Sequence, residues 1–283
     1  MFEVRVAQHA GACFGVERAL RLVYDTAEKS DGAVYTLGPL IHNPIVVADL
    51  EQSCVHVATS VDQVPEGSTL ILRTHGVAPS VATEARAAGL EVVDATCPFV
   101  TRCHEAAKSL AEAGYQVVVV GEKGHPETEA TSAEVAGSLI LGSGSCVREA
   151  ELTNKVGLVC QTTISEQTLS EVAGAIVCKV RETKVENTIC AATRERQEAA
   201  RELAAGADVM IVLGGKASAN TCHLFDIASA VCGRTHHIEE ASELDPAWFE
   251  GARLVGLTAG ASTPKDHIDA CVRALEDLAR GAR

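Results

Sequence analysis

The stretch Glu91-Val92-Val93-Asp94-Ala95-Thr96-Cys97-Pro98-Phe99-Val100 decides how this chain is expected to fold. Its apolar start is typical of a strand, and Pro98 at the first position of a following helix places Cys97 at or beside the N-cap. The N-terminus of a helix carries partial positive charge, so it favours the thiolate form of a cysteine. A thiolate is the ligand that a soft metal site needs. The stretch therefore predicts a strand, a candidate metal ligand and a helix in succession.

The same succession occurs twice more in the chain. Cys13 follows an apolar strand pattern at Val4–Val6, and Cys190 follows one at Asn187–Ile189. Cys13 and Cys97 are 84 positions apart, and Cys97 and Cys190 are 93 positions apart. Helical patterns after the three cysteines predict helices over Val16–Lys29, Val100–Gly114 and Arg194–Ala205. After each helix come two apolar strands that end in polar loops, which contain His42 and His75, His125 and Thr162, and Ser218 and Ser262.

These cycles predict an α/β protein built from three similar α/β modules. The modules are expected at residues 1–95, 96–187 and 188–283. Repeats at this period favour a pseudo-threefold, trefoil-like arrangement. Alternating strands and helices predict parallel sheets with polar residues at the carboxyl ends of the strands. If the axis passes between the modules, the three cysteines converge on one point, where the centre would hold a metal cluster.

Composition limits the class of protein. The chain has 283 residues, of which 47% are hydrophobic and only 3% aromatic, so an aliphatic core is expected. The longest apolar run, Val117–Val120, is far shorter than the roughly 18–20 residues that cross a bilayer. No signal or transit pattern precedes the first strand, which predicts a cytoplasmic protein without a membrane partner. The net charge of −14 disfavours nucleic acid as a partner, because an acidic surface repels phosphates.

Eleven cysteines do not predict a disulfide framework, because their number is odd and no secretory signal is present. No pair has the C-x-x-C spacing of zinc ribbons or thioredoxin-type sites. Three converging thiolates suit an iron–sulfur cluster or zinc. For one cysteine alone, packing as a small buried hydrophobe is the better interpretation. The repetition of one context favours a metal site for Cys13, Cys97 and Cys190.

Polar residues in the loops suggest binding and proton transfer, although each alone is a weak signal. The histidines His42, His75 and His125 could neutralise an anion or could be ordinary turn residues. The loop Gly214–Asn220 is rich in glycine and could cradle phosphate through N–H and hydroxyl groups. Glu127 is a candidate general acid, but an unperturbed glutamate titrates near ~4.3, so this role needs a raised pKa. The alternative is an exposed loop glutamate.

At this level of detail the sequence resembles the LytB family, the 4-hydroxy-3-methylbut-2-enyl diphosphate reductases of the non-mevalonate isoprenoid pathway. The matching motifs follow the family's order over nearly the whole chain, and together they are very specific. They are Gly11-Ala12-Cys13-Phe14-Gly15-Val16, Ile41-His42-Asn43, Thr74-His75-Gly76-Val77, Asp94-Ala95-Thr96-Cys97-Pro98, Gly124-His125-Pro126-Glu127, Gln161-Thr162-Thr163, Arg196-Gln197-Glu198-Ala199 and Thr258-Ala259-Gly260-Ala261-Ser262.

The resemblance implies a reductase that removes the allylic hydroxyl of its substrate as water, using two electrons and two protons, and forms isopentenyl and dimethylallyl diphosphate. It implies one [4Fe-4S] cluster per chain on the three cysteines, with the substrate hydroxyl on the free iron, and ferredoxin or flavodoxin as electron donor. Glu127 would deliver protons, while His125 and Thr162 would order the hydroxyl. The residues implied to hold the diphosphate are His42, His75, Ser218, Asn220 and Ser262, with help from His125. The resemblance also favours the first strand, within residues 1–12, as a member of the third module's sheet.

The sequence departs from the family pattern at a few positions. The third phosphate loop reads Lys216-Ala217-Ser218-Ala219-Asn220, where the family usually has Lys-Asn-Ser-Ser-Asn. Ala219 removes a hydroxyl that would contact the diphosphate. Ala191 and Arg194 replace the more usual Tyr and Thr after Cys190. Two alternatives stay open: an iron–sulfur enzyme for another substrate, resembling quinolinate synthase in plan, and a redox sensor that binds a cluster or zinc without turnover.

Overall fold

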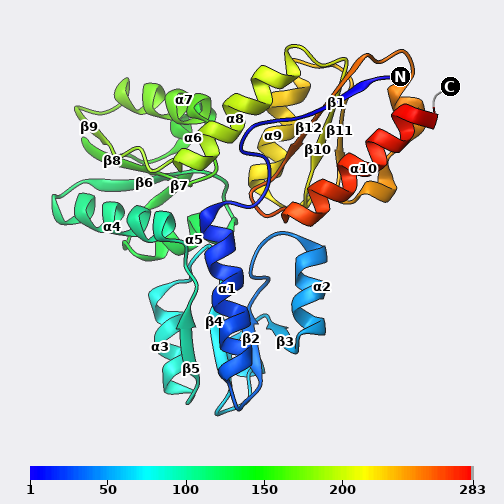
Figure 1. Ribbon diagram of the computed structural model, residues 1–283. Coiled ribbons are helices and arrows are strands. Elements are labelled where there is room, and N and C mark those ends of the chain that lie inside the picture. The colour runs from blue at the N-terminus through cyan, green and yellow to red at the C-terminus, as the bar shows by residue number, and fades with distance from the viewer. Residues whose placement is uncertain (282–283) are drawn as a thin grey trace. The chain divides into compact units, whose positions relative to one another are not determined.

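A computed structural model describes residues 1–281 of the chain as an α/β protein. Over these residues it contains three four-stranded sheets in which all paired strands run parallel (Figure 1). The chain divides into two compact units. The terminal unit comprises Met1–Phe14, His42–Pro44 and the chain from Ala191 onward, and the central unit comprises Gly15–Ile41 and Ile45–Cys190. The predicted α/β class with three similar sheet modules is confirmed.

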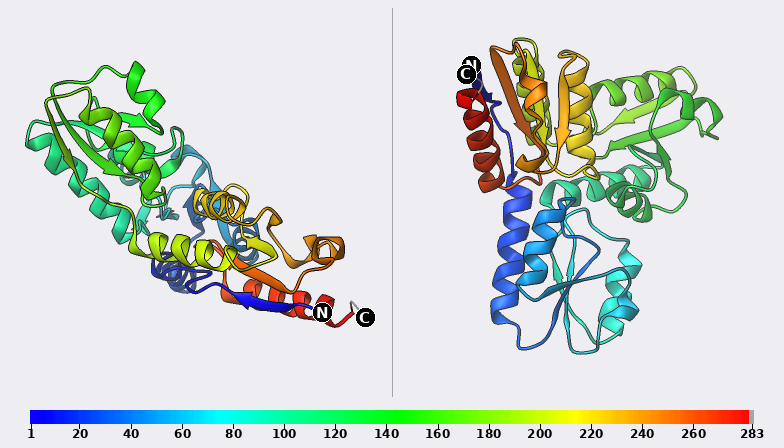
Figure 2. Two further views of the ribbon diagram at one scale, coloured as in Figure 1. Left: turned by 90° about the horizontal axis from the view of Figure 1, so that it is seen from above. Right: turned by 90° about the vertical axis from the view of Figure 1, so that its right-hand side faces the viewer.

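The first sheet of the central unit has the strand order β3-β2-β4-β5. The central strand β4 is buried at every position, as expected for a parallel strand covered on both faces. Helices α1 and α2 cover one face, and α3 covers the other (Figure 2). The elements of this module are α1 (Phe14–Lys29), β2 (Val34–Leu37), α2 (Pro44–Gln52), β3 (Val55–Ala58), η1 (Val61–Gln63), β4 (Thr69–Leu72), α3 (Pro79–Ala87) and β5 (Glu91–Asp94).

The second sheet of the central unit has the order β7-β6-β8-β9. The run of valines in β6 sends side chains to both faces, and each face has its own apolar cluster. Val118 and Val120 pack with α6 and α7, whereas Val117 and Val119 pack with α4 and the region of α5. The elements are α4 (Pro98–Glu112), β6 (Gln116–Val120), α5 (Pro126–Ala133), β7 (Leu139–Leu141), α6 (Gly144–Glu149), β8 (Lys155–Cys160), α7 (Glu166–Val177) and β9 (Glu182–Val185).

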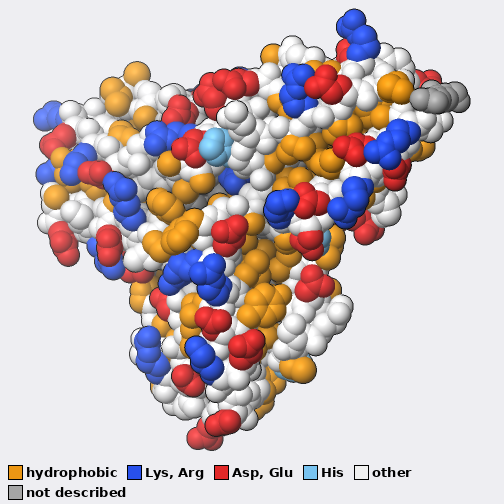
Figure 3. All heavy atoms as spheres, in the orientation of Figure 1, with side chains coloured by type: hydrophobic (Ala, Val, Ile, Leu, Met, Phe, Trp, Pro, Cys, Tyr) orange, Lys and Arg blue, Asp and Glu red, His pale blue; other side chains and the backbone are white. Residues whose placement is uncertain are grey.

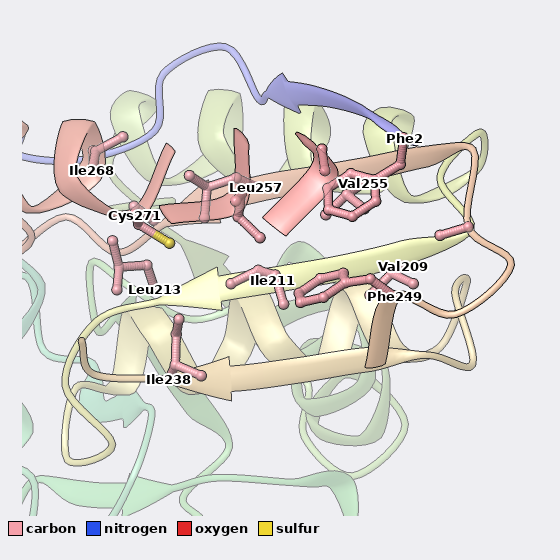
Figure 4. Close-up of a cluster of buried hydrophobic side chains, with 14 residues drawn as sticks. Phe2, Val209, Ile211, Leu213, Ile238, Phe249, Val255, Leu257, Ile268 and Cys271 are labelled. Carbon is pink, nitrogen blue, oxygen red and sulfur yellow. The ribbon is translucent and has the colours of Figure 1, made fainter. Parts of the chain in front are cut away.

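The terminal unit holds the third sheet, with the order β1-β12-β10-β11. Strand β1 pairs in parallel with β12, so the first strand of the chain lies in this sheet. Figure 4 shows the apolar cluster on one face, where Leu213 and Leu257 lie beside Cys271. The elements are β1 (Glu3–Val6), α8 (Ala191–Ala204), β10 (Val209–Leu213), α9 (Ala219–Ser229), β11 (Thr235–Ile238), η2 (Ala241–Glu243), η3 (Pro246–Phe249), β12 (Leu254–Ala259) and α10 (Lys265–Gly281).

The structure corrects several local predictions. The helices after Cys13 and Cys190 begin earlier than their apolar patterns predict, directly behind each cysteine, whereas α4 begins at Pro98 as the Cys97-Pro98 pair predicts. Residues Asn187–Ile189 are not a strand, because β9 has already ended at Val185. The elements that were not predicted include α5, β7, α6, α9 and β11, together with β9 and the 3-10 helices η1, η2 and η3. They are short, and the apolar residues of α5 and α9 do not gather on one side of the helix, so neither carries the broad apolar stripe by which a helix is recognised.

Among the described residues, no helix is both long and apolar enough to cross a membrane.

Candidate active site

The three repeated cysteines share one local structure. Cys97 is the N-cap of α4, while Cys13 and Cys190 directly precede α1 and α8. None of the three is in a disulfide, and all three are half-buried. Each backbone N–H donates to a carbonyl two residues beyond the end of a central strand: Cys97 to Thr74 at 2.9 Å, Cys190 to Thr162 at 3.0 Å and Cys13 to Ala261 at 3.2 Å. Each cysteine is therefore tied to a polar loop of the sheet that contains the strand before it, β5 for Cys97, β9 for Cys190 and β1 for Cys13. These loops supply candidate substrate ligands.

Glu127 lies in the first turn of α5 and not in an exposed loop, the alternative that the sequence left open. Its side chain is buried, at 1% exposure. Thr162 donates to both carboxylate oxygens, with its N–H to Oε1 at 2.5 Å and its Oγ1–H to Oε2 at 2.9 Å. Burial raises the pKa of Glu127 to about 7 although the two Thr162 bonds lower it. This carboxyl can therefore exchange a proton near neutral pH, as a general acid must.

His125 is the N-cap of α5, and its Nδ1 accepts the Glu127 N–H at 3.1 Å. Because Nδ1 is an acceptor, a neutral His125 carries its proton on Nε2, which is then a donor. The His125 ring meets the His75 ring edge-on, with centroids 5.5 Å apart. The central unit thus brings together four of the predicted site residues: Glu127, Thr162, His125 and His75.

The terminal unit brings together the others: His42, Ser218, Asn220 and Ser262. Ser218 is the N-cap of α9 and Asn220 is the second residue of this helix, so both lie at a helix start where a loop was expected. Ser262 donates from Oγ to the His42 carbonyl at 3.4 Å. Asn43 donates from Nδ2 to the Ser262 carbonyl at 2.8 Å. The short segment around His42 is therefore fastened to the loop after β12.

The start of α9 is closely packed and contains a buried amide without a partner. At Gly214, where φ is +143°, an added Cβ would lie 2.7 Å from Thr263 Oγ1. At Gly215 it would collide with the His42 carbonyl, so the loop needs both glycines. Asn220 is 4% exposed, and neither Nδ2 nor Oδ1 has a hydrogen-bond partner within the described chain. A buried amide without partners costs ~1–3 kcal/mol, which is consistent with a ligand that completes its bonds.

Two positions around this site were not found from the sequence. Arg196 on α8 is 2% exposed and donates from its NH2 group to the Gly11 carbonyl at 2.8 Å, two residues before Cys13. It stands in a family motif, but nothing in the sequence predicts burial of a charged side chain. Thr188 binds the end of β8 beside Thr162, and no sequence signal marks it.

Comparisons with known proteins show the family of this chain. A family model described as LytB protein matches residues 4–276. The chain belongs to the LytB family. A relative in Pelobacter propionicus, named 4-hydroxy-3-methylbut-2-enyl diphosphate reductase, is 48% identical over 94% of this chain and 95% of its own length. A protein of the same name in Aquifex aeolicus is 43% identical over 99% of this chain and 98% of its own.

Two solved structures that are named as diphosphate reductases share the fold. One, of (E)-4-hydroxy-3-methyl-but-2-enyl diphosphate reductase, is 43% identical, has a TM-score of 0.71, and is matched over 98% of this chain and 100% of its own. Another, of the corresponding reductase from Plasmodium falciparum, is 26% identical, with a TM-score of 0.92 over 96% of this chain and 87% of its own. The family and the fold class predicted from the sequence are both confirmed.

Proposed function

We propose that this chain is a 4-hydroxy-3-methylbut-2-enyl diphosphate reductase, the enzyme of the last step of the non-mevalonate pathway. The observation that carries the proposal is the Glu127 carboxyl. It is buried, it accepts two hydrogen bonds from Thr162, and its pKa of about 7 suits proton delivery at neutral pH. The chain belongs to the LytB family, and its relatives are named 4-hydroxy-3-methylbut-2-enyl diphosphate reductase.

The reaction breaks the allylic C–O bond. Two electrons and two protons enter, the oxygen leaves as water, and the allylic fragment gains one hydrogen to give isopentenyl or dimethylallyl diphosphate. Hydroxide is a poor leaving group, so the oxygen must be protonated as the bond breaks. Glu127 is proposed to supply this proton, with Thr162 fixing the carboxylate and the Nε2–H of His125 helping to orient the hydroxyl.

Cys13, Cys97 and Cys190 are proposed to hold one [4Fe-4S] cluster per chain. The donor set fits, because three cysteines that form no disulfide precede three helices in the same local structure, and thiolates are the ligands of such clusters. When bound, a cluster with three cysteine ligands supplies electrons and an iron with a free coordination position. The convergence of the three modules on this cluster, and their boundaries at residues 95–96 and 187–188, are part of the proposal.

The diphosphate is proposed to bind between hydroxyl, amide and imidazole groups from several loops. In the terminal unit, Asn220 offers an unpaired buried amide, and Ser218 and Ser262 stand beside it in the loops that follow β10 and β12. Helix α9 directs its N-terminal N–H groups toward this position, which favours an anion. The residues proposed to bind the whole substrate, at its hydroxyl or at its diphosphate, are His42, His75, His125, Thr162, Ser218, Asn220 and Ser262. Among these, Thr162 is proposed to order the hydroxyl.

Ferredoxin or flavodoxin is the proposed electron donor, and the cytoplasmic location stays a prediction. No nucleic-acid or membrane partner is expected. On the face drawn in Figure 3, Lys and Arg side chains alternate with Asp and Glu side chains, without the broad basic area that binds nucleic acid.

A competition experiment tests the substrate class. Pyrophosphate should inhibit reduction of the hydroxylated allylic diphosphate competitively, because it would bind where the diphosphate group of the substrate binds. Cys97→Ser should lose cluster stability, while a Cys54→Ser control at an exposed cysteine should load normally. Absence of pyrophosphate inhibition would favour the quinolinate synthase-like alternative, and a loaded protein without any turnover would favour the sensor. A fully loaded and active Cys97→Ser variant would refute that ligand.

A further inference from the structure

Thr188 occupies the place of a neighbouring strand at the end of β8. The ladder between β8 and β9 ends at the pair Leu158 and Val185. Beyond it, the Thr188 hydroxyl accepts the Cys160 N–H at 2.7 Å and donates to the Cys160 carbonyl at 2.6 Å. One hydroxyl can donate and accept at once, so a single side chain satisfies both backbone groups of Cys160. The Cys160 carbonyl also accepts from Cys103 Sγ at 3.3 Å, but the bond to the Cys160 N–H on this side comes from Thr188.

The residue that Thr188 holds leads directly to the proton-delivery site. Two positions after Cys160, Thr162 donates to both oxygens of Glu127. Two positions after Thr188, the Cys190 N–H donates to the Thr162 carbonyl at 3.0 Å. The segments 160–162 and 188–190 are thus joined at both ends. A shift at Thr188 would move Thr162, and with it the Glu127 carboxylate.

We propose that Thr188 is a positioning residue for proton delivery, because it sets the end of β8 from which Thr162 holds the Glu127 carboxylate. This inference rests on the proposed function and adds a residue to its site. Thr188 touches neither Glu127 nor the substrate ligands directly. Its effect is geometric: a misplacement of ~1 Å in a catalytic group can lower a rate by ~100-fold.

The test compares two variant holoenzymes with the wild type. Thr188→Val keeps the shape of the side chain and loses the hydrogen bonds of the hydroxyl, whereas Thr188→Ser keeps the hydroxyl. Thr69→Val is the matched control, since Thr69 is a buried threonine with hydroxyl contacts to Ser30 and Glu91 in the other sheet of the central unit. In Thr188→Val, kcat should fall about tenfold or more with KM changed less than about threefold. Thr188→Ser should restore most of kcat, and Thr69→Val should keep it.

Iron is counted in every variant, because Thr188 lies two residues from Cys190. If Thr188→Val does not load, Thr188→Ala takes its place. Equal kcat in Thr188→Val, Thr188→Ser and wild type overturns the proposal. Failure of both the Val and Ala variants to load, with the Ser variant loaded, also overturns it, because Thr188 would then serve folding and not positioning.

A second readout needs no turnover and so separates this inference from the proposed function. Infrared difference spectra follow the protonation of the Glu127 carboxyl in substrate-free holoenzyme, with Glu127→Gln to assign the band. The titratable groups that face Glu127 are Cys103, Cys160, Glu122 and His125. None of these residues is substituted in the variants. Thr188→Val removes the Thr188 bonds to Cys103 and Cys160, which raises the pKa of both thiols further above 7, so both stay neutral while Glu127 titrates. Weaker Thr162 bonds should therefore move the titration midpoint of Glu127 to higher pH in Thr188→Val. An unmoved midpoint with an unmoved band would contradict the proposal even if the chain reduced another substrate.

Discussion

The two polar regions of this protein are built in opposite ways. Around Glu127 in the central unit, both carboxylate oxygens are hydrogen-bonded, and the Thr162 that binds them is itself held through its carbonyl and its preceding residues. At the start of α9 in the terminal unit, both polar atoms of the Asn220 side chain are buried without a partner in the described chain. The hydroxyls of Thr221 and Thr258 are buried there in the same condition.

The difference matches the two tasks that the proposed reaction sets. A group that transfers a proton must be held in place before the substrate arrives, because its geometry determines the rate. A group that binds a diphosphate can keep its hydrogen-bonding capacity for the ligand, and the bonds then made to a charged group are the strong ones. Under the proposed function, the Glu127 region is preorganised for proton transfer, and the Asn220 region would gain its missing bonds from the anion.

Replacement of Glu127 should have the largest effect on turnover. Glu127→Gln keeps the shape and removes the proton, so kcat should fall by ~10²–10⁴-fold, the usual contribution of a general acid. The iron content and KM should change little. Glu129→Gln is the control on the same helix, because Glu129 is exposed. Steady-state kinetics of reconstituted protein give the answer, and unchanged turnover in Glu127→Gln would remove the proton-donor role.

Replacement of Asn220 should act on binding and not on chemistry. Loss of one hydrogen bond to a charged group costs ~1.5–3 kcal/mol, which corresponds to a rise of about 10- to 150-fold in KM. The kcat of Asn220→Ala at saturating substrate should stay within about threefold, because the Glu127 region is untouched. Asn154→Ala, at an exposed position, is the control. A fall in kcat without a change in KM would contradict the division of tasks between the two units.

The pH dependence of kcat should report the Glu127 carboxyl. This group must be protonated to donate, and with a pKa of about 7 its protonated fraction falls as the pH rises through that value. We therefore expect kcat to be level at lower pH and to decline about tenfold per pH unit well above 7. The weak residual activity of Glu127→Gln should lack this decline. A decline that persists in Glu127→Gln would assign the titration to another group.

The smallest expected effect is a lower KM from a substitution in the third phosphate loop. Ala219 is buried at the first position of α9, beside Asn220. Ala219→Ser adds the hydroxyl that the family usually has there and should lower KM by up to about tenfold. Ala217→Ser, at an exposed neighbour, is the control and should change nothing. A higher KM in Ala219→Ser would show that the helix start has no room for the hydroxyl.

Much of the fold was readable because repeated local patterns encode it. The valines of β6 and the proline after Cys97 predicted a buried strand and a helix start, and both are present. Short helices without an apolar stripe could not be predicted. The start of α9, for example, depends on the Ser218 cap and on close packing at Gly214.

Candidate site residues could be named from the sequence, but their surroundings could not be predicted. Glu127 stands in a recognisable motif, yet the burial that raises its pKa and the two Thr162 bonds that lower it join residues 35 positions apart. The same holds for Thr188, whose neighbour is the end of a strand 28 positions earlier. Contacts of this range are set by sheet topology, and a single sequence does not specify which strand ends meet.

The most direct test of the central claim is anaerobic reduction of 4-hydroxy-3-methylbut-2-enyl diphosphate by dithionite and a mediator. The protein is reconstituted first, and its iron and sulfide are counted. We predict about four iron atoms per chain together with isopentenyl and dimethylallyl diphosphate as products. A full cluster without either product would contradict the account and point to another substrate or to a sensor.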